Sequence, residues 1–330
     1  MKLPHRRQFL HLAPGFAALL AASSIAGAQT YPSRPITIVV PVAVGGSMDT
    51  IGRVMAERMN NSLGRPVIIE NVTGGGGTVG VGRVAHAPPD GYTLVLGNNS
   101  SHVLAGVAYA LQYDLLNDFE PVALLSTYPG ALVARKTMQA NDLNGLIVWL
   151  KANPDKATLG TGVRGGTAHI AGLFFQKQTG TRFQLVPYRG ATPAVQDLVA
   201  GQIDLVMSDP TAALPQVRAG TIKAYGITTK TRLSSAPDVP TLDESGLPGF
   251  EVSAWHGLWA PKGTPKNIIA KLNASAIDAL AVPTVRARLA DLGQEIFPPD
   301  QQTPAALGAF QRAEIEKWWP IIKAAGITPE

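Results

Sequence analysis

The sequence of 330 residues contains no cysteine. This absence excludes disulfide bonds, thiolate metal ligands and cysteine nucleophiles, and it also excludes a lipid anchor on a cysteine after a cleavage site. Charged residues are scarce too, at 15% of the chain, and beyond the first residues there is no Lys/Arg run of the kind that follows a phosphate backbone. We therefore do not expect nucleic acid as a partner.

The first 28 residues have the pattern of an export signal. A basic start is followed by an apolar stretch at about residues 12–25 and by Ala-Gly-Ala at 26–28, which fits the small-x-small cleavage rule. Arg6 and Arg7, followed by Gln-Phe-Leu, match the core of a twin-arginine signal. The apolar stretch is too short for a membrane anchor, which needs about 20 residues. We expect a periplasmic protein cleaved after Ala28, with twin-arginine export favoured over the Sec route.

Cleavage there removes three basic residues and no acid, so the formal charge falls from +5 to 5 − 3 = +2. A nearly neutral mature protein argues against a highly charged tricarboxylate as its ligand.

Strand-like runs alternate with helical patterns along the rest of the chain. The first helix has a clear period, with Met48, Ile51, Met55 and Met59 on one side. Strands are expected at 36–42, 67–72, 93–98, 130–136, 158–163, 183–188, 203–209 and 222–229, and helices at 47–63, 78–87, 142–152, 167–178, 192–200 and between 265 and 322. This order predicts an α/β protein with two lobes, each a mostly parallel sheet flanked by helices.

The stretch NVTGGGGTVG at 71–80 carries Gly75, Gly77 and Gly80 in the spacing of a dinucleotide fingerprint. That fingerprint also needs an acidic residue about 20 positions on, at the end of the next strand. Asn-Asn-Ser stands there instead, at 98–100. NAD is moreover a cytoplasmic metabolite, so we expect no nucleotide and no other cofactor.

A different feature explains these glycines, because Gly-Gly followed by Ser or Thr opens a predicted helix three times. The copies are Gly45-Gly46-Ser47, Gly76-Gly77-Thr78 and Gly165-Gly166-Thr167. Free N–H groups and the positive end of the dipole make a helix N-terminus attract anions, and glycine lets a ligand approach the backbone. One such turn is also an ordinary helix cap, but copies in both lobes predict a cleft with N–H donors on both walls.

Seven stretches carry a resemblance to a known family. They are YPSRPITIVVPVAVGGSMDTIGR, RPVIIENVTGGGGTVG, APPDGYTLVLG, GTAHIAGLFF, VPYRGATPAVQDLVAGQIDLVMSD, PDVPTLDESGLPGFE and the segment from Trp255 to Pro265. Spanning roughly residues 31–322, they resemble the Bug family, the extracytoplasmic receptors of tripartite tricarboxylate transporters. One departure is Val42-Ala43-Val44, where members often have an aromatic residue and a proline.

The resemblance implies a monomeric, two-lobed periplasmic binding protein of the Venus-flytrap type, type II-like and without enzymatic activity. It would capture a small mono- or dicarboxylate, aliphatic or aromatic, and pass it to the membrane permease. Lobe one is expected at 29–128 and 251–330, and lobe two at 129–250. The lobes should rotate about crossings near 126–131 and 229–253.

In that family, backbone amides of the first Gly-Gly loop hold the ligand carboxylate, aided by polar groups and waters from the second lobe. With the third Gly-Gly turn added, the expected ligand-binding residues are Val44, Gly45, Gly46, Ser47, Asp49, Gly77 and Thr78 in lobe one, and Gly166, Thr167, His169, Tyr188, Arg189 and Asp209 in lobe two. Position 46 should need a small residue, because a Cβ there would occupy ligand space and require a dihedral that favours glycine.

Three of these residues have a second interpretation. Asp49 either orients the loop or a water, or simply favours the dipole of its helix. His169 either donates to the ligand or packs within its own helix. Arg189 either pairs with a second carboxylate or fixes a surface turn.

Catalysis has little support in the sequence. No Gly-x-Ser-x-Gly elbow occurs, and the six histidines form no metal-binding cluster. The alternatives to a receptor are a periplasmic enzyme or a ligand-sensing protein that acts on a small carboxylate, and a scaffold without a ligand.

Overall fold

The structure of the chain is a computed structural model that describes residues 31–324. The predicted export signal at residues 1–28 lies outside the described residues. Two mixed β-sheets form the framework, and both belong to one compact unit that begins at Arg34.

The first sheet has six strands in the order β11-β4-β10-β3-β1-β2. β1 pairs in parallel with β2 and β3, whereas β10 and β11 run antiparallel to their neighbours. The strands are β1 (Ile36–Val40), β2 (Val67–Asn71), β3 (Thr93–Asn98), β4 (Phe119–Pro129), β10 (Ser253–Pro261) and β11 (Glu295–Ile296).

The second sheet has five strands in the order β7-β6-β8-β5-β9. Here β6 pairs in parallel with β7 and β8, and β5 runs antiparallel to β8 and β9. The strands are β5 (Ala131–Arg135), β6 (Thr158–Thr161), β7 (Gln184–Pro187), β8 (Leu205–Ser208) and β9 (Ile222–Ile227).

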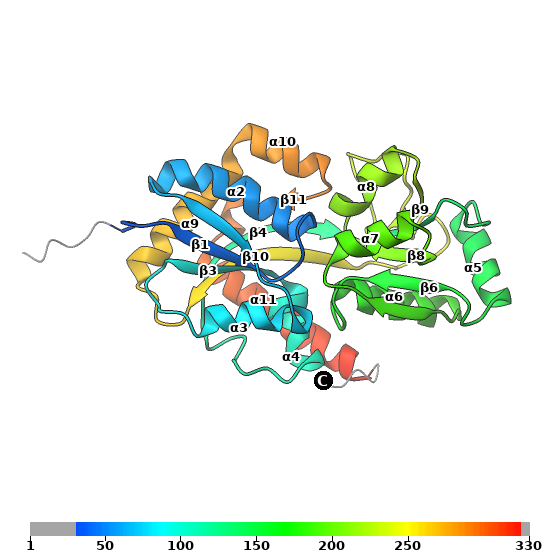
Figure 1. The fold of residues 1–330 in the computed structure, drawn as a ribbon, viewed down its shortest axis with the longest axis horizontal. Coiled ribbons are helices and arrows are strands. Elements are labelled where there is room, and N and C mark those ends of the chain that lie inside the picture. The colour runs from blue at the N-terminus through cyan, green and yellow to red at the C-terminus, as the bar shows by residue number, and fades with distance from the viewer. Residues whose placement is uncertain (1–30, 325–330) are drawn as a thin grey trace, which may run out of the picture. The chain divides into compact units, whose positions relative to one another are not determined.

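Helices flank both sheets (Figure 1). Around the first sheet lie α2 (Ser47–Leu63), η2 (Gly75–Gly77), α3 (Thr78–Ala85), η3 (Ser100–Leu104), α4 (Ala105–Ala108), α9 (Lys266–Ala281), α10 (Pro283–Asp291), η4 (Pro299–Gln301) and α11 (Pro304–Ala324). Around the second lie α5 (Leu143–Ala152), α6 (Thr167–Thr179), α7 (Ala191–Val199) and α8 (Pro210–Arg218). We call each sheet with its helices the first and the second lobe.

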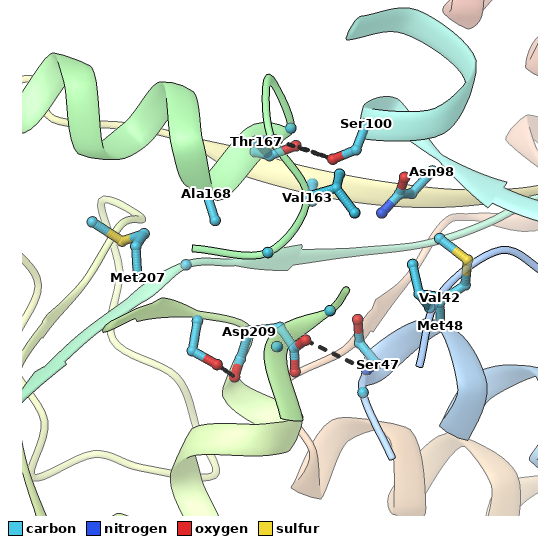
Figure 2. A pocket seen from close by; sticks show the side chains of 18 of the residues that line it. Val42, Ser47, Met48, Asn98, Ser100, Val163, Thr167, Ala168, Met207 and Asp209 are labelled. Carbon is cyan, nitrogen blue, oxygen red and sulfur yellow. Dashed lines mark hydrogen bonds between the residues drawn. The ribbon is translucent and has the colours of Figure 1, made fainter. Parts of the chain in front are cut away.

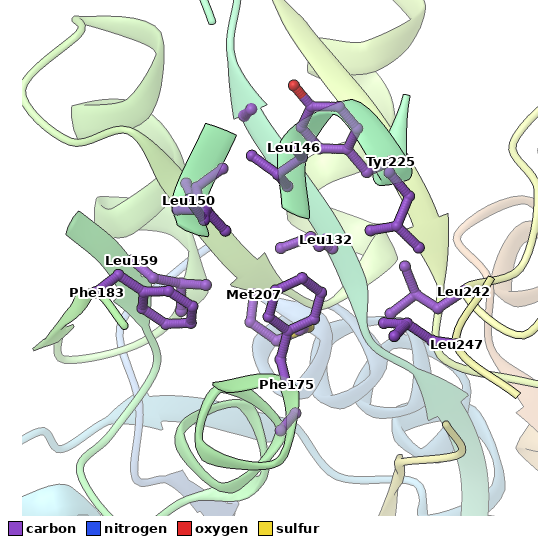
Figure 3. Close-up of a cluster of buried hydrophobic side chains, with 14 of the residues drawn as sticks. Leu132, Leu146, Leu150, Leu159, Phe175, Phe183, Met207, Tyr225, Leu242 and Leu247 are labelled. Atoms are coloured by element: carbon purple, nitrogen blue, oxygen red, sulfur yellow. The ribbon is translucent and has the colours of Figure 1, made fainter. Parts of the chain in front are cut away.

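Each lobe has its own hydrophobic core. In the second lobe, Leu132 and Met207 from the sheet meet Phe175 of α6 and Leu146 of α5 (Figure 3). Apolar side chains alternate along the strands and recur at helical spacing along the helices, so that one face of each element is buried. This burial fixes the helices on the sheet. The two cores hold the loops at the carboxyl ends of the strands in place.

The lobes are joined by a long antiparallel pair, β4 and β10. Its register runs from Ser253↔Pro129 to Pro261↔Phe119, and β4 leads through Gly130 directly into β5 of the second sheet. β10 was not predicted as a strand, because almost every residue in it is buried and the alternation typical of a half-exposed strand is missing.

The predicted two-lobed α/β fold is confirmed, with corrections in detail. The sheets are mixed rather than mostly parallel, because β10 and β11 in the first sheet and β5 in the second run antiparallel to their neighbours. The unpredicted α8 starts at Pro210 and includes Pro215, two residues that usually indicate a turn. β11 and η4 interrupt the region between 265 and 322 that was expected to be helical.

Within residues 31–324, no single helix is both long and apolar enough to cross a membrane. α9 and α10 meet that criterion only together, and they bend by 72° at their junction.

Candidate ligand-binding site

A cavity lies between the two lobes, at the carboxyl ends of strands from both sheets (Figure 2). Loops after β1, β3, β6 and β8 form its walls, and parts of β4 and β10 line it as well. Its volume is about 100 Å³. Because one water needs roughly 10–15 Å³ on this scale, the cavity suits a molecule of roughly seven to ten non-hydrogen atoms.

Hydroxyl and amide groups supply most of the polar lining of the cavity. These side chains are Ser47, Asn98, Ser100, Ser101, Tyr128, Thr167, Ser208 and Asp209. Among the described residues, Asp209 is the only carboxylate in the lining, and no Lys, Arg or His contributes to it. Any charge on a ligand must therefore be balanced by backbone dipoles or by Asp209.

The first Gly-Gly loop brings the N-terminus of α2 to the cavity. Gly46 and Ser47 line it, and Gly46 is the N-cap residue, so no side chain of its own caps this helix. Gly45 has φ +91°, a value that favours glycine, whereas Gly46 has φ −82°. The expectation that position 46 needs an unusual dihedral is therefore wrong, and the restriction applies to position 45.

Asp49 fixes the shape of this loop from behind. Its carboxylate accepts hydrogen bonds from the Gly45 N–H and from Asn71 Nδ2, each at 3.0 Å, and forms an ion pair with Arg53 at 2.9 Å. Burial alone raises the pKa of Asp49, but the bonds from Arg53, Gly45 and Asn71 outweigh it and hold the pKa below its usual value. Asp49 does not line the cavity, and the Gly45 N–H is already occupied.

The acceptor at the start of α2 comes from the other lobe. The Ser47 N–H donates to Asp209 Oδ2 at 3.5 Å, and Asp209 Oδ1 accepts from the Ala212 N–H at 3.0 Å as the N-cap of α8. Burial is the main influence on Asp209 and raises the pKa of this carboxyl, although the hydrogen bonds oppose it. Asp209 thus meets the α2 N-terminus from the opposite lobe (Figure 2).

The second Gly-Gly loop repeats this arrangement in the opposite direction. α6 begins at Thr167 after the N-cap Gly166, again without a capping side chain of its own. Ser100 of the first lobe supplies the acceptor, since its Oγ receives the Thr167 N–H at 3.1 Å and lies 3.2 Å from Thr167 Oγ1. A Cβ at Gly166 would lie only 2.9 Å from Ser100 Oγ, so this contact requires glycine.

The two helix starts therefore exchange caps between the lobes. We call the contacts Asp209 to Ser47 and Ser100 to Thr167 the cross-lobe caps. A further bond from the Ala43 N–H to the Arg189 carbonyl, at 3.1 Å, also joins the lobes. The described structure is thus a closed arrangement of the two lobes around the cavity.

The third Gly-Gly turn touches the cavity with one residue. Gly76 lines it, whereas Gly77 lines a neighbouring cleft and Thr78 lines neither. A Cβ at Gly76 would meet the Tyr109 ring, which packs over the turn, so the close approach needs glycine.

That neighbouring cleft, the outer cleft, is formed by Gly74–Gly77, Tyr109, Val163, Arg164, Pro187–Arg189 and Pro193, and it shares Pro41 and Ala43 with the cavity. Tyr188 and Arg189 lie here rather than in the cavity. The Tyr188 hydroxyl donates to Asp197 at 2.7 Å, and burial together with this carboxylate raises the pKa of the phenol to about 12.

Two other predicted residues do not line the cavity. Val44 is 57% exposed at the first loop. His169 sits on α6 with an Nδ1 that has no hydrogen-bond partner within the described chain, and burial, with some effect of Arg164, lowers its pKa to about 4. Its packing within the helix was the second interpretation of this residue.

Several lining residues were not predicted, notably Asn98, Ser100 and Tyr128. Asn98 is the last residue of strand β3 and Ser100 follows it by two positions, and polar groups at the carboxyl end of a parallel strand indicate a site at that edge. Tyr128 lies on β4 and gave no comparable signal, because a crossing was expected near 126–131 but no strand was predicted over Phe119–Pro129.

The fold and the cavity define a periplasmic binding protein, as solved structures show. The periplasmic binding protein BugD matches with a TM-score of 0.87 and 38% identity, covering 91% of this chain and all of BugD. MatC of Rhodopseudomonas palustris, solved with bound malate, matches with a TM-score of 0.84 and 40% identity over 88% of this chain and all of MatC. An R. palustris protein solved with adipate has a TM-score of 0.86 and 31% identity, covering 91% of this chain and all of that protein.

Sequence comparison identifies the family. The family model described as tripartite tricarboxylate transporter family receptor matches residues 51–327. A protein encoded in the TAR-I ttuE-ttuC' intergenic region of Agrobacterium vitis is 41% identical, over 94% of this chain and 91% of its own length. BugT of Bordetella pertussis is 34% identical, over 94% of this chain and 95% of BugT. The chain belongs to the tripartite tricarboxylate transporter receptors, a family of extracytoplasmic solute-binding proteins that includes the Bug proteins.

Proposed function

We propose that this receptor holds one small mono- or dicarboxylic acid in the cavity, with a carboxylate at the N-termini of α2 and α6. The observation that carries the proposal is that these two helix starts face the cavity from opposite lobes and have no capping side chain of their own. The first N–H groups of a helix have no partner inside the helix, and together with the positive dipole end they bind anions readily. The malate and adipate in two similar structures are of this chemical class.

The proposed ligand-binding set follows from the lining of the cavity. Gly46, Ser47, Gly166, Thr167 and Asp209 stay in the set as direct contacts. Gly45 and Asp49 act by shaping the first loop, and Gly77, Tyr188 and Arg189 belong to the outer cleft, where a longer acid would extend. Val44, Thr78 and His169 have no direct role in this proposal.

The wider biology is part of the same proposal. The protein is exported, cleaved after Ala28 and active as a periplasmic monomer that delivers its ligand to the permease of a tripartite tricarboxylate transporter. The lobe boundaries at 128/129 and 250/251 lie near the crossings of β4 into β5 and of the chain into β10. Intact-mass measurement of the exported protein tests the cleavage, because retention of the first 28 residues contradicts it.

The alternative of an enzyme needs a nucleophile beside a base. Within residues 31–324, two serines lie beside a histidine. Ser126 Oγ lies 3.1 Å from His256 Nδ1, but both residues are fully buried and neither lines the cavity. Ser101 Oγ lies 3.0 Å from His102 Nδ1, and burial lowers the pKa of His102 to about 3, which makes it a weak base at neutral pH. These pairs favour the receptor over the enzyme.

A thermal-shift screen of carboxylic acids on ligand-stripped protein tests the proposal. An acid that binds only the folded state raises the melting midpoint, and the rise grows with its concentration. For the best acid, calorimetry then compares the acid with its primary amide. We expect the amide to bind about tenfold to a hundredfold more weakly, because it loses a charge-assisted hydrogen bond. Equal affinity for both would place no carboxylate at the helix starts.

A further inference from the structure

The outer cleft differs from the cavity in the charge of its lining. Within residues 31–324, the side chains that line the cavity include one acid, Asp209, and no Lys, Arg or His. The outer cleft is lined by two cations, Arg164 and Arg189, and by no acid of the described chain. Side chains of the cavity therefore do not attract an anion from solution, whereas those of the outer cleft do.

The outer cleft adjoins the cavity on the side away from the strands that join the lobes. The two spaces share the lining residues Pro41, Ala43, Gly76 and Val163. β4 and β10 line the cavity, but none of their described residues lines the outer cleft. The cleft has a volume of about 800 Å³ against about 100 Å³ for the cavity, so an acid can occupy it with water around it. The outer cleft thus lies at the entrance of the cavity.

Both arginines are held at the junction of the lobes through their backbone. The Tyr109 hydroxyl donates to the Arg164 carbonyl at 3.0 Å, and the Ala43 N–H donates to the Arg189 carbonyl at 3.1 Å. Both donors belong to the first lobe, and both line the outer cleft. These bonds fix the place of the two arginine loops. Because they involve the carbonyls, they do not neutralise the guanidinium charges.

Both arginines also occupy positions where a cation is unfavourable for the fold. Arg164 lies two residues before Gly166, the N-cap of α6, and Arg189 lies directly before Gly190, the N-cap of α7. The positive end of a helix dipole favours acids there and disfavours cations. The charge of Arg164 reaches the first turn of α6, because it is the second cause, after burial, that lowers the pKa of His169. Helix stability therefore does not account for the two arginines.

Two other clefts of the described chain carry charges of both signs. The cleft between α10 and the loop after β9 contains the ion pair of Lys230 and Glu251 at 3.5 Å. The cleft beside the start of α11 contains the ion pair of Lys262 and Glu120 at 3.0 Å. In both clefts the cations are accompanied by acids, and the outer cleft departs from this arrangement.

We propose that Arg164 and Arg189 form an electrostatic entrance, which draws a carboxylate into the outer cleft on its way to the helix starts of the cavity. This inference rests on the proposed function, because it requires a carboxylate ligand in the cavity. Fixed charges at the rim of a site raise the association rate constant, and salt screens their effect. The two arginines thus act on the rate of capture rather than on the choice of ligand.

Stopped-flow fluorescence tests the proposal. Trp318 of α11 stacks on Phe174 of α6 across the lobes, with ring centroids 6.2 Å apart, so tryptophan emission follows closure. The probes are malate and adipate, and, if neither raises the melting midpoint, the acid that ranks first in the thermal-shift screen.

The test variant combines Arg164→Gln with Arg189→Gln. At an ionic strength of about 10 mM, we expect its association rate constant to lie about threefold to tenfold below that of the wild type. The dissociation rate constant should stay within about twofold, because a rim charge acts mainly on association. At about 500 mM salt, the difference in association should fall below about twofold.

Two further double variants serve as controls. Arg164→Lys with Arg189→Lys keeps both charges without the guanidinium fork and should retain the wild-type rate, whereas a bidentate contact with the bound acid would be lost. Lys151→Gln with Lys156→Gln removes two exposed charges of the second lobe that line neither the cavity nor the outer cleft. This variant should also associate at the wild-type rate.

The outcomes separate the inference from the proposed function. An unchanged association rate constant in the arginine-to-glutamine variant overturns the inference and leaves the proposed function intact. A loss seen only in the dissociation rate constant overturns it too, because the arginines would then hold the bound acid directly. Equal slowing by the lysine-to-glutamine variant would assign the effect to net charge and also overturn it. A screen in which no acid binds contradicts the proposed function, and the inference with it.

Discussion

Asp49 shows how a residue can govern a binding loop without touching the cavity. Its carboxylate occupies the Gly45 N–H, so the residues of the loop that line the cavity are Gly46 and Ser47, whose N–H also meets Asp209. Gly45 can hold this conformation because its φ of +91° is open to glycine. Of the two interpretations of Asp49 from the sequence, the geometry favours orientation of the loop.

Replacing Asp49 should therefore lower both the affinity for the ligand and the stability of the fold. Asp49→Ala removes charge-assisted bonds to Gly45, Asn71 and Arg53, and we expect a loss of about 2 kcal/mol in the free energy of unfolding. The affinity for the best acid should fall about tenfold, because the loop loses its fixed shape. Urea unfolding and calorimetry measure the two effects.

Glu70→Gln is the matched control for Asp49, since Glu70 pairs with Arg83 on the exposed surface. Surface pairs contribute little, so this variant should stay within about 0.5 kcal/mol of the wild type. If Asp49→Ala behaved like Glu70→Gln, the carboxylate would have no role in shaping the loop.

Among the elements, four helices differ in the origin of their N-caps. α5 and α8 begin with their own aspartates, Asp142 and Asp209, whose side chains accept from the first turn. α2 and α6 begin with glycine and receive their acceptors from the other lobe. The two helices that form the walls of the cavity are thus the ones whose capping depends on closure.

Ser100→Ala should shift the empty protein towards an open arrangement. It removes the acceptor of the Thr167 N–H, worth about 1 kcal/mol, or about fivefold in the closed-to-open ratio. Small-angle scattering should then give a larger radius of gyration without ligand and an unchanged radius at saturating ligand.

Ser208→Ala serves as the control, because Ser208 also lines the cavity but donates to the neighbouring Asp209 carbonyl within its own lobe. This variant should scatter like the wild type. Identical curves for ligand-free Ser100→Ala and wild-type protein would show that the contact does not hold the lobes together.

The same elements explain what the sequence predicted and what it did not. The Gly-Gly turns were predictable because strand, glycine pair and helix follow one another locally, and their residues meet in the cavity at Gly46, Gly76 and Gly166. Ser100 and Tyr128 were not, because their roles depend on contacts between lobes that no local pattern records. His169 is near the α6 start in sequence, yet its side chain does not line the cavity.

For the whole molecule, two buried histidines link stability to pH. His102 stacks on Trp259 with ring centroids 3.9 Å apart, and His256 stacks on Tyr128 at 4.6 Å. Burial lowers the pKa of each to about 3, so both stay neutral in the folded protein at any pH near neutrality. The unfolded chain takes up protons at these positions below about pH 6.5, which favours unfolding.

We therefore expect stability to fall on acidification from pH 7 to pH 5. His102 and His256 each contribute about 2 kcal/mol to the loss. His169, whose pKa burial lowers to about 4, adds about as much, which gives about 6 kcal/mol together. The raised pKa of Asp209 acts in the opposite direction. Urea unfolding at both pH values measures the difference. In His256→Gln this difference should shrink by about a third. A pH-independent wild type contradicts the burial of neutral histidines.

The cross-lobe caps also determine which ligands allow the receptor to close. Under the proposed function, a guest that enters the cavity separates two donors from their acceptors at once, the Ser47 and Thr167 N–H groups. A ligand with an acceptor for only one of these N–H groups leaves the other N–H without a partner. A ligand with acceptors for both replaces both bonds and restores closure. The cavity then acts as a coincidence detector: the lobes close only when both N–H groups find an acceptor at the same time.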